Sequence, residues 1–239
     1  MHKQQYQRFL VIRTDRMGDV ILSTPVLTAL KQSFPNSHIT MMVRSYTKEI
    51  IEGHPDLDDI IIDDPDGIHR GWRGIFKLAK ELRSKKFDIV VLLHPKSRLA
   101  VLCWLAGIPN RLGTAYRAYS FLLNHRVKIH RKNAAKHECD LNLELVKSIG
   151  AKLDPVKFKF IIPQEANDKV DRLLIENSIN PGDPFIVIHP GSGGSAMDWP
   201  LEYFGRLAQM IELPVALTGI KSEKEKLDLV EKIARKKLV

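Results

Sequence analysis

A polar loop near the N-terminus carries the first residues that could do chemistry. It reads Arg13-Thr14-Asp15-Arg16-Met17-Gly18-Asp19-Val20 and joins an apolar run to an amphipathic segment. Because ligands bind beyond the carboxyl ends of the strands in an open α/β sheet, this position suits a binding loop. Asp19 would lie at or beside a helix N-terminus, where unpaired N–H groups favour an ionised carboxylate. Such a carboxylate could accept a proton from a bound hydroxyl, or Asp19 could simply cap the helix.

A second loop, 189–200, has the composition of a phosphate-binding loop. It reads His189-Pro190-Gly191-Ser192-Gly193-Gly194-Ser195-Ala196-Met197-Asp198-Trp199-Pro200. Its glycines let the backbone approach a ligand closely, and its serines add hydroxyl donors to the backbone N–H groups. Pro200 suits the first position of the helix that should follow. The loop matches neither the nucleoside-triphosphate P-loop nor the Gly-x-Gly-x-x-Gly dinucleotide motif, which disfavours both classes. A flexible connection between domains is the alternative.

The remaining polar motifs do not indicate a metal site. Asp64-Pro65-Asp66 resembles a metal-binding Asp-x-Asp motif, but within Asp63–Gly67 it is more typical of a turn. His137-Glu138 lacks the second histidine of a zinc protease, and a structural role is expected for it. Cys103 and Cys139 have no Cys-x-x-Cys partner and are expected to be buried thiols. We therefore expect neither a metal nor another cofactor.

The positive charge is concentrated in one segment. The 239-residue chain has a net charge of +9, and the stretch from Ile89 to His137 contains nine cations and no Asp or Glu. These cations are Lys96, Arg98, Arg111, Arg117, Arg126, Lys128, Arg131, Lys132 and Lys136. Such a stretch predicts a face that meets a phosphorylated acceptor, a membrane surface or nucleic acid, unless it is only a solvated surface. Nucleic acid is disfavoured because no nucleic-acid-binding motif is recognisable and aromatic residues make up only 7%.

Short apolar runs alternate with amphipathic helical patterns, which predicts an α/β fold with a parallel sheet covered by helices. The expected strands are 9–13, 39–43, 60–62 and 89–93, and the expected helices are 20–32, 46–52, 72–84, 97–106, 134–149 and 165–176. The Asn180–Pro184 cluster breaks the pattern. Beyond it we expect strands at 185–188 and 214–217 and helices at 200–211 and 222–236.

This pattern divides the chain into two expected domains, 1–165 and 166–239. Two βα units would leave a sheet edge and much helix surface uncovered, so we expect the second domain to be incomplete. The longest apolar stretch, Leu99–Ile108, is too short to span a bilayer, and the N-terminus lacks the features of a signal peptide. A cytoplasmic location without a transmembrane segment is therefore expected.

Four segments together resemble a known family. They are RTDRMGDVILSTPVLTALKQSFP, RLGTAYRAYSFLLNHRV, KHECDLNLELVKSIGA and VIHPGSGGSAMDWPLEYFGRLAQ, in this order. They resemble the ADP-heptose:lipopolysaccharide heptosyltransferases, glycosyltransferase family 9. The resemblance implies a GT-B architecture of two Rossmann-like domains, the second truncated here. It also implies inverting, metal-independent transfer from an ADP-sugar donor to an anionic glycolipid acceptor, at the inner face of the inner membrane.

The resemblance also implies roles for individual residues. Asp19 matches the general base of the family's Met-Gly-Asp motif. Ser192 and Gly193 fall where the donor phosphates are contacted, and Glu223 falls in the region that holds the adenosine ribose. Arg117 and Arg126 are candidates for holding the phosphorylated or carboxylated acceptor.

Two departures from the family pattern leave two functions open. The family has a phosphate-neutralising Lys where this chain has Met197, and its Asp-Ser/Thr-Gly-x-x-His segment does not occur in these 239 residues. The loss of one preorganised charge-stabilising group costs about 3 to 4 kcal/mol in a transition state. The chain is therefore expected to be either a heptosyltransferase-type enzyme or an inactive remnant or acceptor-binding module without a complete donor site.

Overall fold

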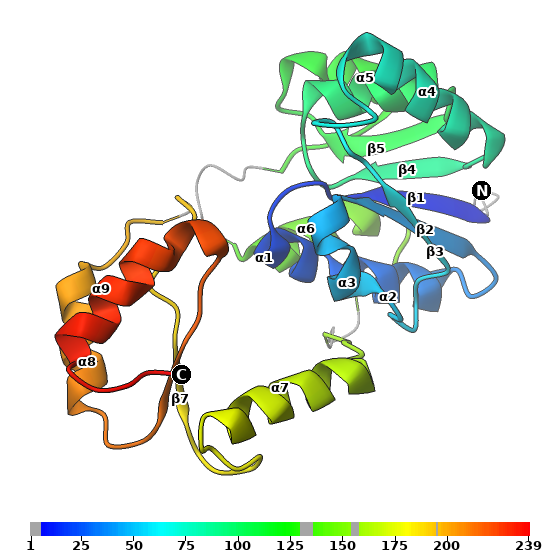
Figure 1. Cartoon of the computed structure of the whole chain (residues 1–239). Helices are drawn as coiled ribbons and strands as arrows, with labels where there is room; N and C mark the ends of the chain where they lie inside the picture. The colour runs from blue at the N-terminus through cyan, green and yellow to red at the C-terminus, as the bar shows by residue number, and fades with distance from the viewer. Residues whose placement is uncertain (1–5, 130–135, 154–157, 195) are drawn as a thin grey trace. The chain divides into compact units, whose positions relative to one another are not determined.

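The computed structural model describes residues 6–129, 136–153, 158–194 and 196–239 (Figure 1). The chain forms two compact units, Met1–Ile161 and Ile162–Val239, which are described separately. The boundary expected from the sequence, after residue 165, falls inside the first helix of the second unit, α7 (Gln164–Glu176).

The first unit is built on a six-stranded sheet in the order β3-β2-β1-β4-β5-β6, with every neighbouring pair parallel. The strands are β1 (Arg8–Ile12), β2 (His38–Val43), β3 (Asp59–Ile62), β4 (Ile89–Leu92), β5 (Asn110–Thr114) and β6 (His125–Val127). The first four confirm the predicted strands. The sequence analysis missed β5 and β6, because these short strands carry polar residues and obtain their order by pairing, as between Ile89 and Asn110.

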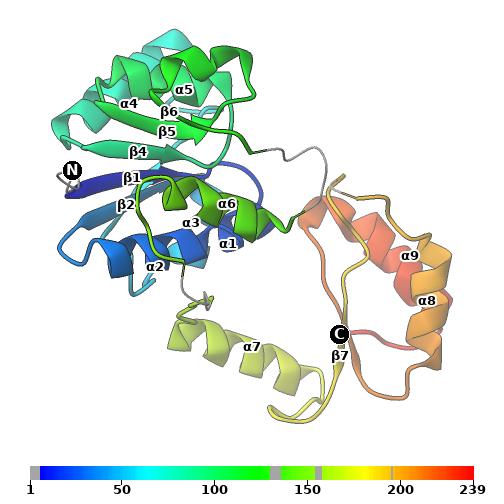
Figure 2. The ribbon, with the colours of Figure 1, turned by 180° about the vertical axis from the view of Figure 1, so that it is seen from behind.

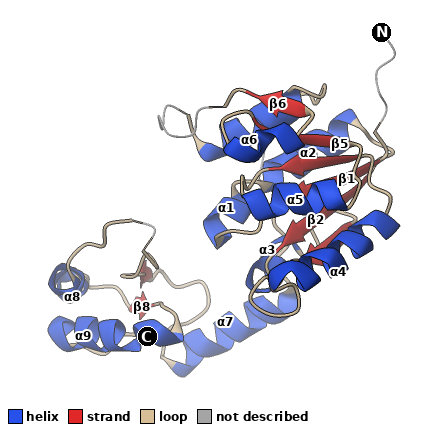
Figure 3. Cartoon of the chain, turned by 90° about the horizontal axis from the view of Figure 1, so that it is seen from above, coloured by secondary structure: helices blue, strands red, loops and turns tan. Residues whose placement is uncertain are grey.

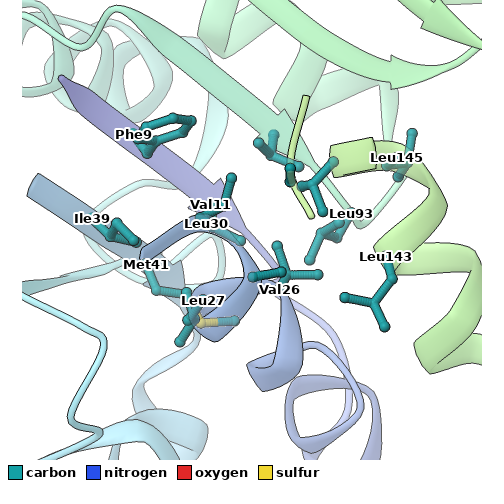
Figure 4. Packing of buried hydrophobic residues seen from close by; sticks show 14 of the residues in the cluster. Phe9, Val11, Val26, Leu27, Leu30, Ile39, Met41, Leu93, Leu143 and Leu145 are labelled. Carbon is teal, nitrogen blue, oxygen red and sulfur yellow. The ribbon is translucent and has the colours of Figure 1, made fainter. Parts of the chain in front are cut away.

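Helices cover both faces of this sheet (Figures 1 and 2). They are α1 (Met17–Ile21), α2 (Thr24–Ser33), α3 (Lys48–Ile51), α4 (Gly71–Ser84), α5 (Ser97–Leu105) and α6 (Glu138–Lys147), with short 3-10 turns η1 (Ser45–Thr47) and η2 (Ala118–Leu122). Phe9 and Val11 of β1 pack with α2 and α6 on one face (Figure 4), whereas Leu10 and Ile12 pack with α4 and α5 on the other. Burial on both faces explains why these strands read as continuous apolar runs.

The single helix predicted over 20–32 is wrong, because the structure breaks it between Ile21 and Thr24. Pro25 has no N–H to donate to the carbonyl of Ile21, so a continuous helix would lose that bond. The hydroxyl of Thr24 donates to the Ile21 carbonyl instead, at 2.9 Å. Ser23 donates to the carbonyl of Asp19 at 2.7 Å and accepts from Asn142 of α6 at 3.2 Å. The break therefore ties α6 to the turn that carries Asp19.

The second unit contains two parallel strands, β7 (Ile186–Ile188) and β8 (Val215–Leu217), with α7, α8 (Leu201–Met210), η4 (Lys221–Glu223) and α9 (Lys224–Ala234) (Figure 3). Helices α8 and α9 pack so closely that a Cβ on Gly205 would lie only 2.5 Å from the Cβ of Ile233. The predicted elements are confirmed to within a few residues. Pro200, however, is the N-cap of α8 and not its first helical residue.

Asp56 ties the end of the first unit to its body. Its carboxylate accepts from Thr28 of α2 at 2.6 Å and from the Lys159 ammonium at 2.6 Å. Burial by itself would raise the pKa of Asp56, but the hydrogen bonds from Lys159 and Thr28 outweigh it and lower the pKa below its ordinary value. The ionised form of Asp56 therefore stabilises the folded state.

We expect Asp56→Asn to lower the free energy of unfolding at pH 7 by about 2 kcal/mol, the usual contribution of hydrogen bonds to a charged group. A lowered pKa in the folded state contributes stability above the unfolded pKa and loses it as the pH falls through the folded pKa. The difference from the wild type should therefore shrink below about pH 4. Urea denaturation across this pH range measures it, with Asp66→Asn, at a carboxylate whose side chain is 81% exposed, as the control. A difference independent of pH would contradict this account.

Candidate functional site

A buried arginine organises the loop that follows β1. Arg13 directly follows this strand, and its side chain is 5% exposed. Its guanidinium forms ion pairs with Asp15 at 2.7 Å, Asp19 at 2.8 Å and Glu138 of α6 at 2.8 Å. It also donates to the carbonyl of Leu93, beyond β4, at 3.3 Å. One cation therefore joins the ends of β1 and β4 to the starts of α1 and α6.

Asp19 is held by this arginine and remains partly open to solvent. It is the third residue of α1, whose N-cap is Arg16, so the interpretation of Asp19 as a helix cap is wrong. Its side chain is 34% exposed, and Oδ1 lies 2.8 Å from Arg13. The carboxylate is thus oriented by a buried, fixed charge and is reachable from solvent. Both properties are needed in a group that accepts a proton from a bound hydroxyl.

A second set of polar groups lies beside this pair. The Thr14 hydroxyl and His94 Nδ1 are 3.2 Å apart, and His94 Nε2 lies 3.9 Å from Asp15. The Tyr46 hydroxyl donates to the carbonyl of Asp15 at 2.7 Å. Burial raises the pKa of Asp15, although the neighbouring Arg13 opposes this shift. These residues follow β1, β2 and β4, and the strand order reverses at the β1–β4 pair, the position where α/β sheets bind ligands.

The sequence analysis missed Arg13, His94 and Glu138 as members of this site. The expectation of a structural role for Glu138 agrees with its ion pair to Arg13, but that partner was not foreseen. One signal was available: Arg13 directly follows the apolar run Phe9–Ile12, which places the start of its side chain beside the core. A buried cation must be paired, so carboxylates from other elements had to be sought.

The nine cations between Ile89 and His137 serve different purposes. Three have partners within the chain: Arg98 pairs with Asp63, Arg111 donates to the carbonyls of Ile108 and Leu122, and the exposed Lys136 pairs with Glu144. The prediction of one continuous anion-binding face is wrong for Arg98 and Arg111, which hold the fold together. Lys96, Arg117, Arg126 and Lys128 are exposed, whereas Arg131 and Lys132 lie outside the described residues.

Three of the exposed cations share one edge of the sheet. Lys96 follows β4, Arg117 follows β5 and Lys128 follows β6. Because all six strands are parallel, these residues lie at the same edge as Arg13 and Asp19. Arg126 lies within β6 and is exposed. The edge therefore carries both a carboxylate that can take a proton and cations that can hold an anion.

The second unit brings two loops together around one carboxylate. Glu223, which is 9% exposed, accepts from the backbone N–H of Ile220 at 3.1 Å. A Cβ on Gly191 would lie 2.0 Å from Oε1 of Glu223, and one on Gly219 would lie 3.3 Å from Oε2. The loops that follow β7 and β8 thus converge on Glu223, and a side chain at position 191 would displace its carboxylate.

Most of the remaining loop is exposed to solvent, namely residues 193, 194 and 196–200. The Ser192 hydroxyl donates to the carbonyl of Ala196 at 3.0 Å, and Gly193 adopts a φ of +57°. The hydrogen bond from Ser192 lowers the pKa of Asp198. Met197 is 98% exposed. Ser195 lies outside the described residues. The structure therefore brings the Ser192 loop to Glu223 but gives Met197 no packing role.

Other sequence predictions are resolved within the first unit. Asp64 accepts from the backbone N–H groups of Gly67 and Ile68, which confirms a turn. Cys103 and Cys139 are buried, and burial raises the pKa of the Cys103 thiol to about 12.

Among the described residues, no group of three or more His, Cys, Asp or Glu side chains could hold a metal ion. In the same part of the chain, no helix has the length and apolar character needed to cross a membrane.

The chain matches known proteins over most of its length. Residues 75–237 match the model of glycosyltransferase family 9 (heptosyltransferase). A Haemophilus influenzae protein whose name places it among the glycosyltransferases is 30% identical over 231 residues. This match covers 92% of the present chain and 66% of the relative, so the chain spans slightly less than two thirds of that relative's length.

Two solved structures share the fold. A family 9 glycosyltransferase from Veillonella parvula superposes with a TM-score of 0.87 at 25% identity, covering 99% of this chain and 69% of the other. The Escherichia coli ADP-heptose lps heptosyltransferase II superposes with a TM-score of 0.74 at 22% identity, covering 94% and 68%. The α/β architecture with its parallel sheet is thus that of the GT-B heptosyltransferases.

We expect Arg13→Met to lower the free energy of unfolding at pH 7 by about 3 to 5 kcal/mol, because three carboxylates then lose their shared buried cation. Arg44→Met is the matched control, since Arg44 directly follows β2 but pairs with the exposed Asp66, and we expect less than about 1 kcal/mol. Equal losses in the two variants, measured by urea denaturation, would contradict a special role for Arg13.

Proposed function

The chain belongs to glycosyltransferase family 9, the heptosyltransferase family, and from this premise we propose that it transfers a heptose or a related sugar from an ADP-sugar to the inner core of lipopolysaccharide. The donor and the acceptor follow the family resemblance and the name of the Escherichia coli ADP-heptose lps heptosyltransferase II. The observation that carries the proposal is the partly open Asp19 carboxylate, oriented by the buried Arg13.

In the proposed reaction, Asp19 is the general base. An acceptor hydroxyl donates its proton to the Asp19 carboxylate while its oxygen attacks the anomeric carbon of the donor. The bond from that carbon to the ADP oxygen breaks at the same time, and ADP leaves with the electron pair. Attack from the side opposite to ADP inverts the anomeric configuration, and the family resemblance implies that no metal takes part. The ion pair to Arg13 fixes the position of the base during this transfer.

The donor would bind at the loops that converge on Glu223. Ser192 and Gly193 would present donors to the diphosphate, and Glu223 would accept from the ribose hydroxyls. The acceptor would be held by Arg117 and Arg126, which are exposed and could pair with phosphate or carboxylate groups of the inner core. Their exposure supports this proposal, as does the position of Arg117 beyond β5, at the edge that carries Asp19.

A second candidate function is acceptor binding without transfer. It is favoured by Met197, which is 98% exposed and occupies the slot of the family's phosphate-neutralising lysine. Methionine supplies neither a charge nor a hydrogen-bond donor to the departing diphosphate. A chain of this kind would still bind the glycolipid through its first unit but would bind ADP weakly.

We expect Asp19→Asn to slow transfer from ADP-heptose to heptose-deficient lipopolysaccharide by at least about 100-fold, the usual contribution of general base catalysis. Product formation by mass spectrometry measures the rate, and calorimetry should show unchanged ADP affinity. The matched control is Asp140→Asn, which removes an exposed acidic residue from the first turn of another helix, α6. If Asp19→Asn transferred sugar at the wild-type rate, the assignment of the base would be wrong.

Met197→Lys should tighten ADP binding by about five- to tenfold, because an added cation beside a diphosphate contributes on the order of 1 kcal/mol. Met210→Lys places the same charge at another exposed methionine of the second unit, 80% exposed on α8, and should leave the affinity unchanged. Calorimetric titration with ADP measures both. Equal tightening by the two substitutions would show a nonspecific charge effect. If ADP bound only to Met197→Lys, acceptor binding without transfer would be the better assignment for the natural chain.

A further inference from the structure

We propose that the outer face of α4, together with the loop before it, docks on the surface of an anionic lipid bilayer. Three large apolar side chains project there: Ile68 is 64% exposed, Trp72 is 65% exposed and Phe76 is 57% exposed. Trp72 and Phe76 are four residues apart on one helix and therefore lie on the same face. Large apolar side chains gathered in this way on a surface indicate an interaction site.

Cations accompany these apolar side chains. Arg70, Arg73, Lys77 and Lys80 are all exposed, and within the described part of the chain none of them pairs with a carboxylate. The only acidic residue of α4 is Glu81. From Gly67 to Lys86, which covers the loop and the helix, the sequence has seven Lys and Arg residues and one acidic residue, Glu81. The surface is thus complementary to an anionic partner.

The fold holds this surface rigidly in place. Asp63 directly follows the strand β3 and has a side chain that is 1% exposed, and Arg98 binds it through two nitrogens at 2.6 and 3.0 Å. The same guanidinium donates to the carbonyl of His69 at 3.1 Å. A Cβ on Gly74 of α4 would lie 2.2 Å from the carbonyl carbon of His69, so the loop packs directly on the helix backbone. Buried interactions therefore fix the loop that exposes Ile68 and leads into Trp72.

The combination of side chains favours a bilayer over other anionic partners. Trp and Phe side chains insert at the boundary between headgroups and acyl chains, while Lys and Arg contact anionic headgroups. Helices that lie in a membrane surface combine these two kinds of residue in the same way. Nucleic-acid binding would use the cations but would not require an exposed aliphatic side chain such as Ile68.

The position of this surface also fits the proposed function, on which the choice of a membrane partly rests. Helix α4 begins beyond the carboxyl end of β3, and Asp19 lies beyond the carboxyl end of the parallel β1. The start of α4 and Asp19 are therefore at the same edge of the sheet. Docking through α4 would bring this edge close to the headgroups, where a glycolipid acceptor presents its sugars.

The test is co-sedimentation of the full chain with vesicles, which needs neither a sugar donor nor an acceptor. We expect binding to vesicles of 70% phosphatidylcholine and 30% phosphatidylglycerol and little binding to phosphatidylcholine alone. Two variants should each reduce the partition coefficient at least tenfold: Trp72→Ser with Phe76→Ser, and Arg73→Gln with Lys77→Gln. The control, Val170→Ser with Ile175→Ser, removes similarly exposed apolar side chains from α7 and should bind like the wild type. Circular dichroism establishes that each variant is folded.

Several results would overturn the proposal. The wild-type chain could remain in the supernatant with anionic vesicles, or the Trp72→Ser, Phe76→Ser variant could bind them as well as the wild type does. A single-stranded RNA oligonucleotide bound more tightly than the vesicles, with both α4 variants defective, would assign the surface to nucleic acid. Asp19→Asn should bind vesicles like the wild type. Failure of the docking proposal would therefore leave the transfer proposal standing, and the reverse also holds.

Discussion

The buried guanidinium of Arg13 is the interaction on which the first unit's candidate site depends. A cation with a side chain only 5% exposed must be paired, and here three carboxylates meet it. The partners come from the loop after β1, from α1 and from α6, and the carbonyl of Leu93 adds the end of β4. These contacts fix the positions of the four elements relative to one another. The carboxylate of Asp19 is therefore held in one position while it stays partly exposed to solvent. In the proposed reaction, a carboxylate held in this way would not need to reorient during proton transfer.

Both units place functional candidates at the carboxyl edge of parallel strands, and each does so around one buried charge. In the first unit this charge is the cation of Arg13, and in the second it is Glu223, against which the loops after β7 and β8 close. A side chain in place of Gly191 would push the Glu223 carboxylate out of this position. The two charges have opposite signs: the cation of Arg13 pairs with carboxylates, and the carboxylate of Glu223 accepts from a backbone N–H group.

Some of the Lys and Arg residues that give the chain its positive charge bind groups within the fold, and others are exposed on the surface. Arg98 and Arg111 hold loops by binding a buried carboxylate or backbone carbonyls, so their charges are part of the fold. Arg117 and Lys128 stand at the sheet edge, and the cations of α4 surround exposed aromatic side chains. The ion pair between Arg98 and Asp63 also supports the exposed surface, because Arg98 fixes the loop that leads into α4. A basic segment in a sequence can therefore contain cations that hold the fold together beside cations that stay exposed.

The sequence by itself determined the secondary structure around the site, since apolar periodicity and turn residues act locally. It gave the first four strands, most helices, the turn at Asp64 and the two loops that carry Asp19 and Ser192. Only the tertiary structure decided which distant groups meet. Glu138 reaches Arg13 from 125 residues away, and β5 and β6 exist because neighbouring strands pair with them. The break before Thr24 combines both levels: Pro25 weakens the helix locally, and Asn142 of α6 occupies the gap. Ion pairs and strand pairing depend on which elements become neighbours, and local patterns do not record this.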